Sequence, residues 1–263
     1  MYEPPISKAT AVVLACIFSL QSLSAFAQED TITLEPVSIT AISRNVFDTE
    51  VPASLHTLER EDIQVLQQQF SLEESLREVP GIFVNNRYNL SQGERISIRG
   101  LGSRAQFGIR SIKILLDGIP LTFPDGTTQL NNLDLSYAAR IDILSGPASA
   151  LFGNAAGGVI AIQSLQPQPG LLISPGITTG SYGFFKPQLQ LQYSKGQISW
   201  LGSATATNFT GYRDFSNGRI YHSNHVVKYS LSTRVTMTAI ANYTNAPYLL
   251  NPGGMSRAEL EQN

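Results

Sequence analysis

The chain has 263 residues and a formal net charge of −2, and only 14% of its residues are charged. The balance gives no polycationic signal for nucleic-acid binding, so no nucleic-acid partner is expected. The charged fraction is far below the roughly 25% usual for soluble domains. Because the hydrophobic fraction is an ordinary 42%, the rest is rich in neutral polar residues. That composition favours β-structure with one polar face and argues against a soluble helical enzyme.

Metal and disulfide chemistry have few residues to work with. Cys16 is the single cysteine and lies near the N-terminus, so no disulfide framework or cysteine metal site is expected. The histidines are His56, His222 and His225, and none has HExxH spacing. His222 and His225 lie three apart in a strand-like stretch and should face opposite ways. The sequence therefore predicts no metal and no cofactor.

Residues 1–27 have the features of a secretory signal peptide. Lys8 precedes an apolar run from residue 9 to 20, and Ala25-Phe26-Ala27 supplies small residues at the cleavage positions. The run is too short to be a spanning helix. A lipoprotein box at Val13-Leu14-Ala15-Cys16 is the alternative, but the apolar run continues past Cys16. We expect cleavage after Ala27 and export.

Residues 28–50 are expected to form an exposed, extended arm. Within it, Val37, Ser38, Ile39, Thr40 and Ala41 alternate apolar and small side chains, as an edge strand does. Such a segment is able to pair with the sheet edge of a partner protein. The alternatives are a first strand of the next domain or a plain linker.

Residues 51–165 have the pattern of a compact α/β unit that begins with two helices. The first is predicted over residues 60–69, with Ile63, Leu66 and Phe70 at helical spacing. The second is predicted to start at a capping box made by Ser71 and Glu74. Pro80-Gly81 is expected to end it. The apolar face of this second helix comprises Leu72, Leu76 and Val79.

Short strands are predicted next, separated by loops rich in Gly, Asn, Asp and Pro. The strands are expected at residues 81–85, 95–99, 112–116, 140–144 and 158–163. The loops span residues 86–94, 100–108 and 121–131. This pattern favours a small mixed sheet with two or three helices over a parallel nucleotide-binding sheet.

From about residue 171 onward, segments of about ten residues alternate apolar and polar side chains. Ile198, Trp200, Ala204 and Ala206 share one face of a segment, opposite serines and threonines. Length and period match membrane β-strands. The aromatic residues expected at membrane interfaces are Tyr193, Trp200, Tyr229 and Tyr243. A soluble antiparallel sheet with one wet face is the alternative, and export with low charge density favours the membrane.

The segment at residues 146–162, GPASALFGNAAGGVIAI, raises the question of a phosphate-binding loop. Gly153 and Gly158 have the P-loop glycine spacing, but Val159 stands where the lysine belongs. No helix follows, and Ser149 lacks the G-x-S-x-G elbow of a nucleophile. We find no catalytic constellation and predict that the chain is not an enzyme. Its glycines and alanines instead suggest tight turns and close packing.

These features, in this order, resemble the N-terminal part of TonB-dependent outer-membrane receptors. Residues 36–41 look like a TonB box, and Val79-Pro80-Gly81-Ile82 matches the family's VPGV. Ile96-Ser97-Ile98-Arg99-Gly100 matches IxIRG, and Leu116-Asp117-Gly118-Ile119-Pro120 matches LDGIP. Residues 146–162 match the segment that closes the plug domain.

The resemblance implies a fold class: an α+β plug domain, a small mixed sheet with short helices, at residues 51–165. Residues 166–263 would then be the first antiparallel strands of a 22-stranded transmembrane β-barrel. It also implies an outer-membrane location, TonB as a partner at Val37–Ala41 and import of a small iron chelate. Ligand contacts would come from two loops and a wall contact from Arg99. The loop residues are Arg104, Gln106, Phe123 and Asp125.

Two departures from the family pattern stand out. Ser145 occupies the place where the family usually has an arginine, which with Arg99 would face acidic residues of the barrel wall. After residue 165 there is room for only about five strands of ~10 residues, and an open sheet edge is not viable in lipid. We therefore expect a fragment or truncated copy that does not transport alone. The alternative is an exported plug-like binding or signalling module without a pore.

Overall fold

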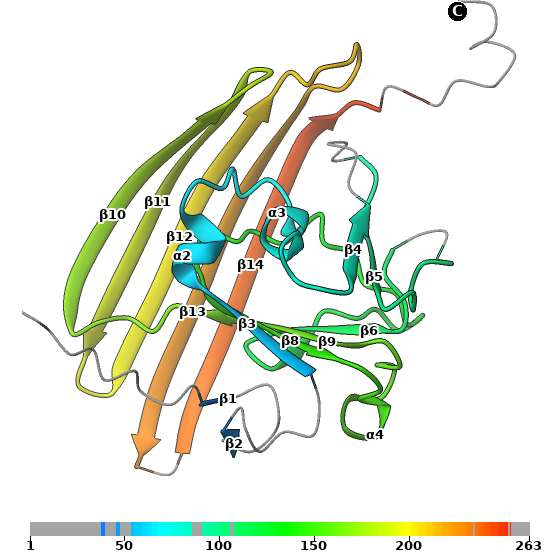
Figure 1. Cartoon of the computed structure of the whole chain (residues 1–263). Helices are drawn as coiled ribbons and strands as arrows, with labels where there is room; N and C mark the ends of the chain where they lie inside the picture. Colours follow the sequence, from blue (N-terminus) through cyan, green and yellow to red (C-terminus); the bar gives the residue numbers. More distant parts are fainter. Residues whose placement is uncertain are drawn as a thin grey trace, which may run out of the picture. The chain divides into compact units, whose positions relative to one another are not determined.

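The computed structural model describes residues 54–85, 91–105, 108–233, 235–251 and 253 (Figure 1). Upstream it describes only the backbone of two short strands, β1 (Ser38–Ile39) and β2 (Val46–Phe47). The predicted signal peptide, the lipoprotein-box alternative and Val37, Thr40 and Ala41 lie outside the described residues. Among the described residues, no helix is long and apolar enough to cross a membrane.

The first predicted helix is half as long as expected. Strand β3 (Ser54–Glu59) leads into α2 (Arg60–Gln64), which a capping box between Glu59 and Asp62 initiates. Ile63 is fully buried, as predicted, but Leu66 is fully exposed and has a φ of 59°. That left-handed conformation cannot continue a helix. The predicted helix over residues 60–69 is therefore wrong beyond Gln64.

The second helix, α3 (Leu72–Leu76), begins where the sequence places it but uses a different cap. Ser71 has the extended backbone of an N-cap residue, but its side chain accepts no capping hydrogen bond from the first turn. The Glu74 carboxylate instead accepts the backbone N–H groups of Gln68, Gln69 and Phe70, at 2.7, 3.1 and 2.9 Å. These bonds satisfy the loop backbone outside a helix, which is why α2 does not extend to residue 69.

The apolar face predicted for α3 is buried as expected, but the helix ends early. Leu72, Leu76 and Val79 are each at most 4% exposed. The helix stops at Leu76 and not at Pro80-Gly81. The Val79 N–H still bonds the Leu76 carbonyl at 3.1 Å, so a turn follows the helix before the chain extends.

A mixed five-stranded sheet forms the body of the predicted plug. Its strand order is β3-β8-β9-β6-β7, with β6 and β9 parallel and the other pairs antiparallel. A separate antiparallel pair joins β4 and β5. The predicted strands are confirmed to within two residues at each end. The bounds are β4 (Ile82–Asn85), β5 (Arg95–Ile98), β6 (Ile112–Leu116), β7 (Ile119–Pro120), β8 (Ala138–Ser145) and β9 (Gly158–Ser164), with α4 (Ser149–Phe152) between β8 and β9.

The core of this unit is built from isoleucines of the central strands. Ile114, Ile141, Ile143 and Ile160 are fully buried in one cluster with α2 and α3 side chains. These β-branched residues suit a pleated, fully covered surface. Leu201 and Val226, from strands described next, belong to the same cluster. The plug core therefore continues into the second half of the chain.

The second half is a five-stranded antiparallel sheet in chain order, as predicted (Figure 1). The segments are longer than the expected ten residues. Their bounds are β10 (Gly170–Gly180), β11 (Phe184–Lys195), β12 (Ile198–Phe209), β13 (Gly218–Ser232) and β14 (Val235–Leu249).

The side-chain alternation of β11–β13 is inverted relative to a soluble sheet. On the buried face lie Lys186, Gln190, Gln192, Ser203, Thr205, Thr207, His222 and Asn224. On the opposite face, Leu189, Tyr221, Val227 and Tyr229 are each about 40% exposed. His222 is buried and His225 exposed, as their spacing predicts. A polar-in, apolar-out period of two is the pattern of membrane β-strands and not of a sheet with one wet face.

Gly158 provides a test of the close packing that the sequence predicts at residues 146–162. Its φ is +138°, and a Cβ atom there would clash with the Leu144 carbonyl oxygen of the neighbouring strand. Gly158→Ala should lower the free energy of unfolding by about 3 kcal/mol or more. Gly153→Ala is the control, since Gly153 has a φ of +75° and nothing within 4 Å, and should cost about 1 kcal/mol. Urea denaturation in detergent measures both, and equal losses would contradict the packing argument.

Candidate functional site

A buried ion pair joins the loop that precedes β8 to the second sheet. The Lys186 Nζ atom on β11 lies 3.1 Å from the Asp134 Oδ1 atom. Their side chains are 2% and 0% exposed. Lys186 also donates to the Gln69 carbonyl oxygen at 3.1 Å, so the α2–α3 loop shares the same ammonium group. An unpaired charge here would be costly, so these three segments are held together.

The Asp134 carboxylate collects donors from three neighbouring strands. Thr205 on β12 and Asn224 on β13 each donate to Oδ2 at 3.3 Å, beside Lys186 on β11. Ser136 adds its N–H to Oδ1 at 3.2 Å and its hydroxyl to Oδ2 at 2.6 Å. Burial by itself raises the pKa of Asp134, but the Lys186 charge and these hydrogen bonds outweigh it and lower that pKa. The residue is therefore an ionised anchor for the strands.

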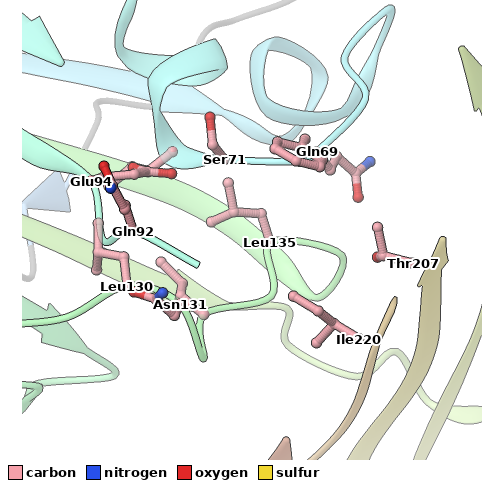
Figure 2. A pocket seen from close by; sticks show the side chains of 12 residues that line it. Gln69, Ser71, Gln92, Glu94, Leu130, Asn131, Leu135, Thr207 and Ile220 are labelled. Carbon is pink, nitrogen blue, oxygen red and sulfur yellow. The ribbon is translucent and has the colours of Figure 1, made fainter. Parts of the chain in front are cut away.

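A small pocket lies between α3 and the strands, next to this anchor. Figure 2 shows Ser71 and Glu94 on one side and Thr207 and Ile220 on the other. The pKa of Glu94 is raised to about 7, chiefly by burial and to a smaller extent by the Glu73 charge, while the hydrogen bond from the Leu72 N–H lowers it. One Glu94 oxygen is buried without a hydrogen-bond partner. The described residues contain no group of three His, Cys, Asp or Glu side chains suited to a metal ion.

The two predicted ligand loops carry exposed side chains. Arg104 is exposed, and Phe123 is 50% exposed. Asp125 accepts hydrogen bonds from both the N–H and the hydroxyl of Thr127, at 2.9 and 2.7 Å. These two bonds are the main cause that lowers the pKa of Asp125. The other Asp125 oxygen lies 4.0 Å from the Arg110 guanidinium. Arg110 was not predicted as a site residue, because no motif in the sequence indicates this pair. Gln106 lies outside the described residues.

The predicted contact of Arg99 with the barrel wall is not among the contacts that join the plug to the described strands. Arg99 is exposed with a φ of 50°, and its side chain makes no ion pair within the described part of the chain. Ser145 is buried at the end of β8, opposite Gly158. The charge contact found instead is the pair of Asp134 and Lys186, with the acid on the plug and the base on the strand. The sequence carried one signal for it: Lys186 is a lone lysine on the polar face of its strand.

Residues 146–162 form close packing and not a phosphate cradle. Ala148, Ala155, Val159 and Ala161 are buried in a second hydrophobic cluster beside β8. The chain turns at glycines of positive φ, and strand β9 rather than a helix follows. The packing interpretation of this segment is confirmed.

The upstream arm contains one backbone pairing. Ser38 of β1 lies opposite Phe47 of β2, and Ile39 lies opposite Val46. An extended, strand-forming backbone at residues 38–39 agrees with the predicted alternation. The role of Val37–Ala41 in binding a partner stays a prediction.

The plug-like mixed sheet and the antiparallel strands with an apolar outer face share one buried polar contact. We call it the polar seam; it consists of Asp134, Lys186, Thr205 and Asn224. Residues 48–159 match the family model "TonB-dependent Receptor Plug Domain". This part of the chain is therefore a TonB-dependent receptor plug domain, and the resemblance read from the sequence is confirmed.

Solved structures share the fold over most of this chain. The pyoverdine outer-membrane receptor FpvA of Pseudomonas aeruginosa PAO1 aligns with a TM-score of 0.65 at 18% identity, over 82% of this chain and 31% of FpvA. The ferric yersiniabactin uptake receptor FyuA of Yersinia pestis aligns at 0.60 and 18%, over 73% and 31%. The siderophore receptor PirA of Acinetobacter baumannii aligns at 0.55 and 16%, over 72% and 31%. The chain thus spans about a third of the length of these receptors.

The buried ion pair predicts a strong coupling between Asp134 and Lys186. Lys186→Met or Asp134→Asn alone should lower the free energy of unfolding by about 3–5 kcal/mol, because each leaves an uncompensated buried partner. The double variant should lose clearly less than the sum of the two. Urea denaturation in detergent measures the cycle. Arg77→Gln, which removes the mostly exposed pair with Glu73, is the control and should cost about 0.5 kcal/mol; additive losses at Asp134 and Lys186 would refute the coupling.

Glu94 predicts a pH dependence of stability. Its pKa is about 7 in the folded protein and 4.5 as the ordinary value, so the folded state binds the extra proton between these limits. The contribution of Glu94 to the free energy of unfolding should be most favourable below pH 4.5. It should fall by up to about 3 kcal/mol as the pH rises to about 7.

Glu94→Gln removes the charge and should flatten this part of the pH profile and stabilise the protein at pH 8. Unfolding curves at pH 5 and pH 8 measure the difference. Glu61→Gln, on an exposed position of α2, is the control and should leave the profile unchanged. An unchanged profile in Glu94→Gln would show that another group titrates.

Proposed function

We propose that this chain is the N-terminal part of an outer-membrane receptor that binds and imports a scarce small ligand, with a ferric siderophore as the best-supported class. The observation that carries the proposal is the plug domain joined through a polar seam to strands with an apolar outer face. A plug inside a barrel wall is the arrangement of plugged outer-membrane transporters. Solved proteins of this fold are receptors for ferric yersiniabactin and pyoverdine.

The energy for import would reach the receptor through the arm at Val37–Ala41. TonB, the periplasmic partner, would pair with this segment by strand addition, which uses backbone hydrogen bonds more than side chains. Ser38 and Ile39 pair with β2 along one edge of β1 in a two-stranded sheet, so TonB would add to the other edge of β1.

The proposal assigns ligand contact to the two plug loops. Arg104 and Phe123 are exposed there, and Asp125 is held in place by Thr127. Gln106 belongs to the same loop as Arg104. An arginine and an aromatic ring on adjacent loops suit a ligand with acidic groups and a planar part. Arg99 is proposed to contact the barrel wall.

Uptake in cells tests this function. Gram-negative cells carrying the gene in its native DNA context should accumulate ⁵⁵Fe supplied with at least one of pyoverdine, yersiniabactin or enterobactin, and a deletion strain should not. Ile39→Pro in the chromosome should reduce accumulation at least about tenfold, since proline removes a strand donor. Ile32→Pro, in the same arm but outside the box, is the control and should retain uptake. Equal uptake in the deletion strain, with the receptor detected in the outer membrane of the parent, would refute the iron-chelate assignment.

A further inference from the structure

A second cleft lies at the end of the strand sheet, and none of its described lining residues belongs to the loops at residues 100–108 and 121–129. Three loops line it: the α2–α3 loop with Gln68 and Phe70, the β10–β11 turn with Ser181 and Tyr182, and the β12–β13 loop with Tyr212. Its volume is about 510 Å³, within the range of about 300–1,000 Å³ of small-molecule sites. Because Phe70 comes from the plug and Phe184 and Phe209 are buried strand residues, the cleft lies between the plug and the strands.

The floor of this aromatic cleft is rigid. Phe70 packs edge-to-face on Phe184 and on Phe209, with ring centroids 5.7 and 5.2 Å apart. Phe184 and Phe209 are only 5% and 8% exposed. Such pairs fix the ring orientations by more than area burial. A ligand therefore meets a preformed aromatic surface.

The rim of the cleft leaves two aromatic rings in water. Tyr182 and Tyr212 are 64% and 57% exposed, and their ring centroids lie 5.9 Å apart. Exposed apolar surface gathered in a concavity marks binding surfaces. The two rings contact each other at an interplanar angle of 59° and form one continuous aromatic surface.

Strained backbone gathers on the loops that carry these rings. Among the described residues that are not glycine, seven have positive φ, and four of these lie on the three lining loops. They are Leu66, Gln69, Tyr182 and Phe215. Each such conformation is unfavourable for a residue with a side chain and is characteristic of ligand clamps and active sites. The backbone at Tyr182 thus adopts an unfavourable positive φ, and its ring lies at the rim of the cleft in this conformation.

The chemistry of the lining selects the occupant. Among the described residues, no charged side chain lines the cleft. Its polar side-chain groups are the Gln68 amide, the Ser181 hydroxyl and the two phenols. A charged group would lose hydration there without a counter-ion. We propose that this cleft binds an uncharged planar aromatic ring of a small ligand, stacked against Tyr182 and Tyr212 over the Phe70 floor. That this ring is part of the imported ligand rests on the proposed function. Binding of an aromatic ring in the cleft does not itself require transport.

Binding of 2-naphthol to the purified chain in detergent tests the proposal, measured by saturation-transfer NMR. Tyr182→Ala and Tyr212→Ala should each weaken binding about tenfold, and Tyr182→Phe should keep it within about twofold, because the ring and not the hydroxyl stacks. Tyr243→Ala is the matched control: Tyr243 is also 64% exposed but lies on β14, outside the cleft.

Three results would overturn the proposal. The first is unchanged binding in both alanine variants. The second is an equal loss in Tyr243→Ala, which would mean nonspecific association with exposed aromatic side chains. The third is equally tight binding of naphthalene-2-sulfonate, which would remove the preference for an uncharged ring. None of them bears on the ⁵⁵Fe uptake of the parent strain. Conversely, failed uptake with intact naphthol binding would refute the transport function and leave the cleft.

Discussion

The contact between Lys186 and Asp134 is the constraint on which the rest of the molecule depends. Both side chains are almost fully buried, so neither charge is tolerated without the other. Asp134 also takes donors from β12 and β13, which fixes three strands relative to one plug loop. Because a strand register slip of one residue would turn these donors to the opposite face, the pair also specifies the register of β11–β13.

The inverted alternation of the strands follows from the same seam. A sheet whose polar side chains are buried needs a polar partner surface. The plug supplies it through the Asp134 carboxylate and the backbone carbonyls of Ser136 and Gln69. Its outer side chains then require an apolar environment, which water does not offer. Plug and strands are therefore complementary in polarity as well as in shape, and Leu201 and Val226 add an apolar contact beside the polar one.

The sequence predicted the parts of this fold that local periodicity controls. Isoleucine-rich segments such as β6 and strict alternation in β11–β13 were assigned correctly, because burial on one or both faces leaves a period in the chain. The helix over residues 60–69 failed because the Glu74 carboxylate, several residues downstream, captures the backbone that the helix needs. The main polar contact was missed for a stronger reason: Asp134 and Lys186 lie far apart in sequence, and neither has a motif. Arg99 and Ser145, which drew attention by family pattern, have no part in that contact.

The α2–α3 loop connects the aromatic cleft to the buried ion pair. Glu74 binds three consecutive N–H groups of this loop, so residues 68–70 behave as one rigid piece. Phe70 at one end forms the cleft floor, and the adjacent Gln69 carbonyl accepts from Lys186. Any shift of Phe70 would therefore move the adjacent Gln69 carbonyl, an acceptor of the buried ammonium, and a lost hydrogen bond there would weaken the contact between plug and strands. Coupling between two sites needs a shared element with differential contacts in each state. The α2–α3 loop touches both sites, and so does β11 through Phe184 and Lys186.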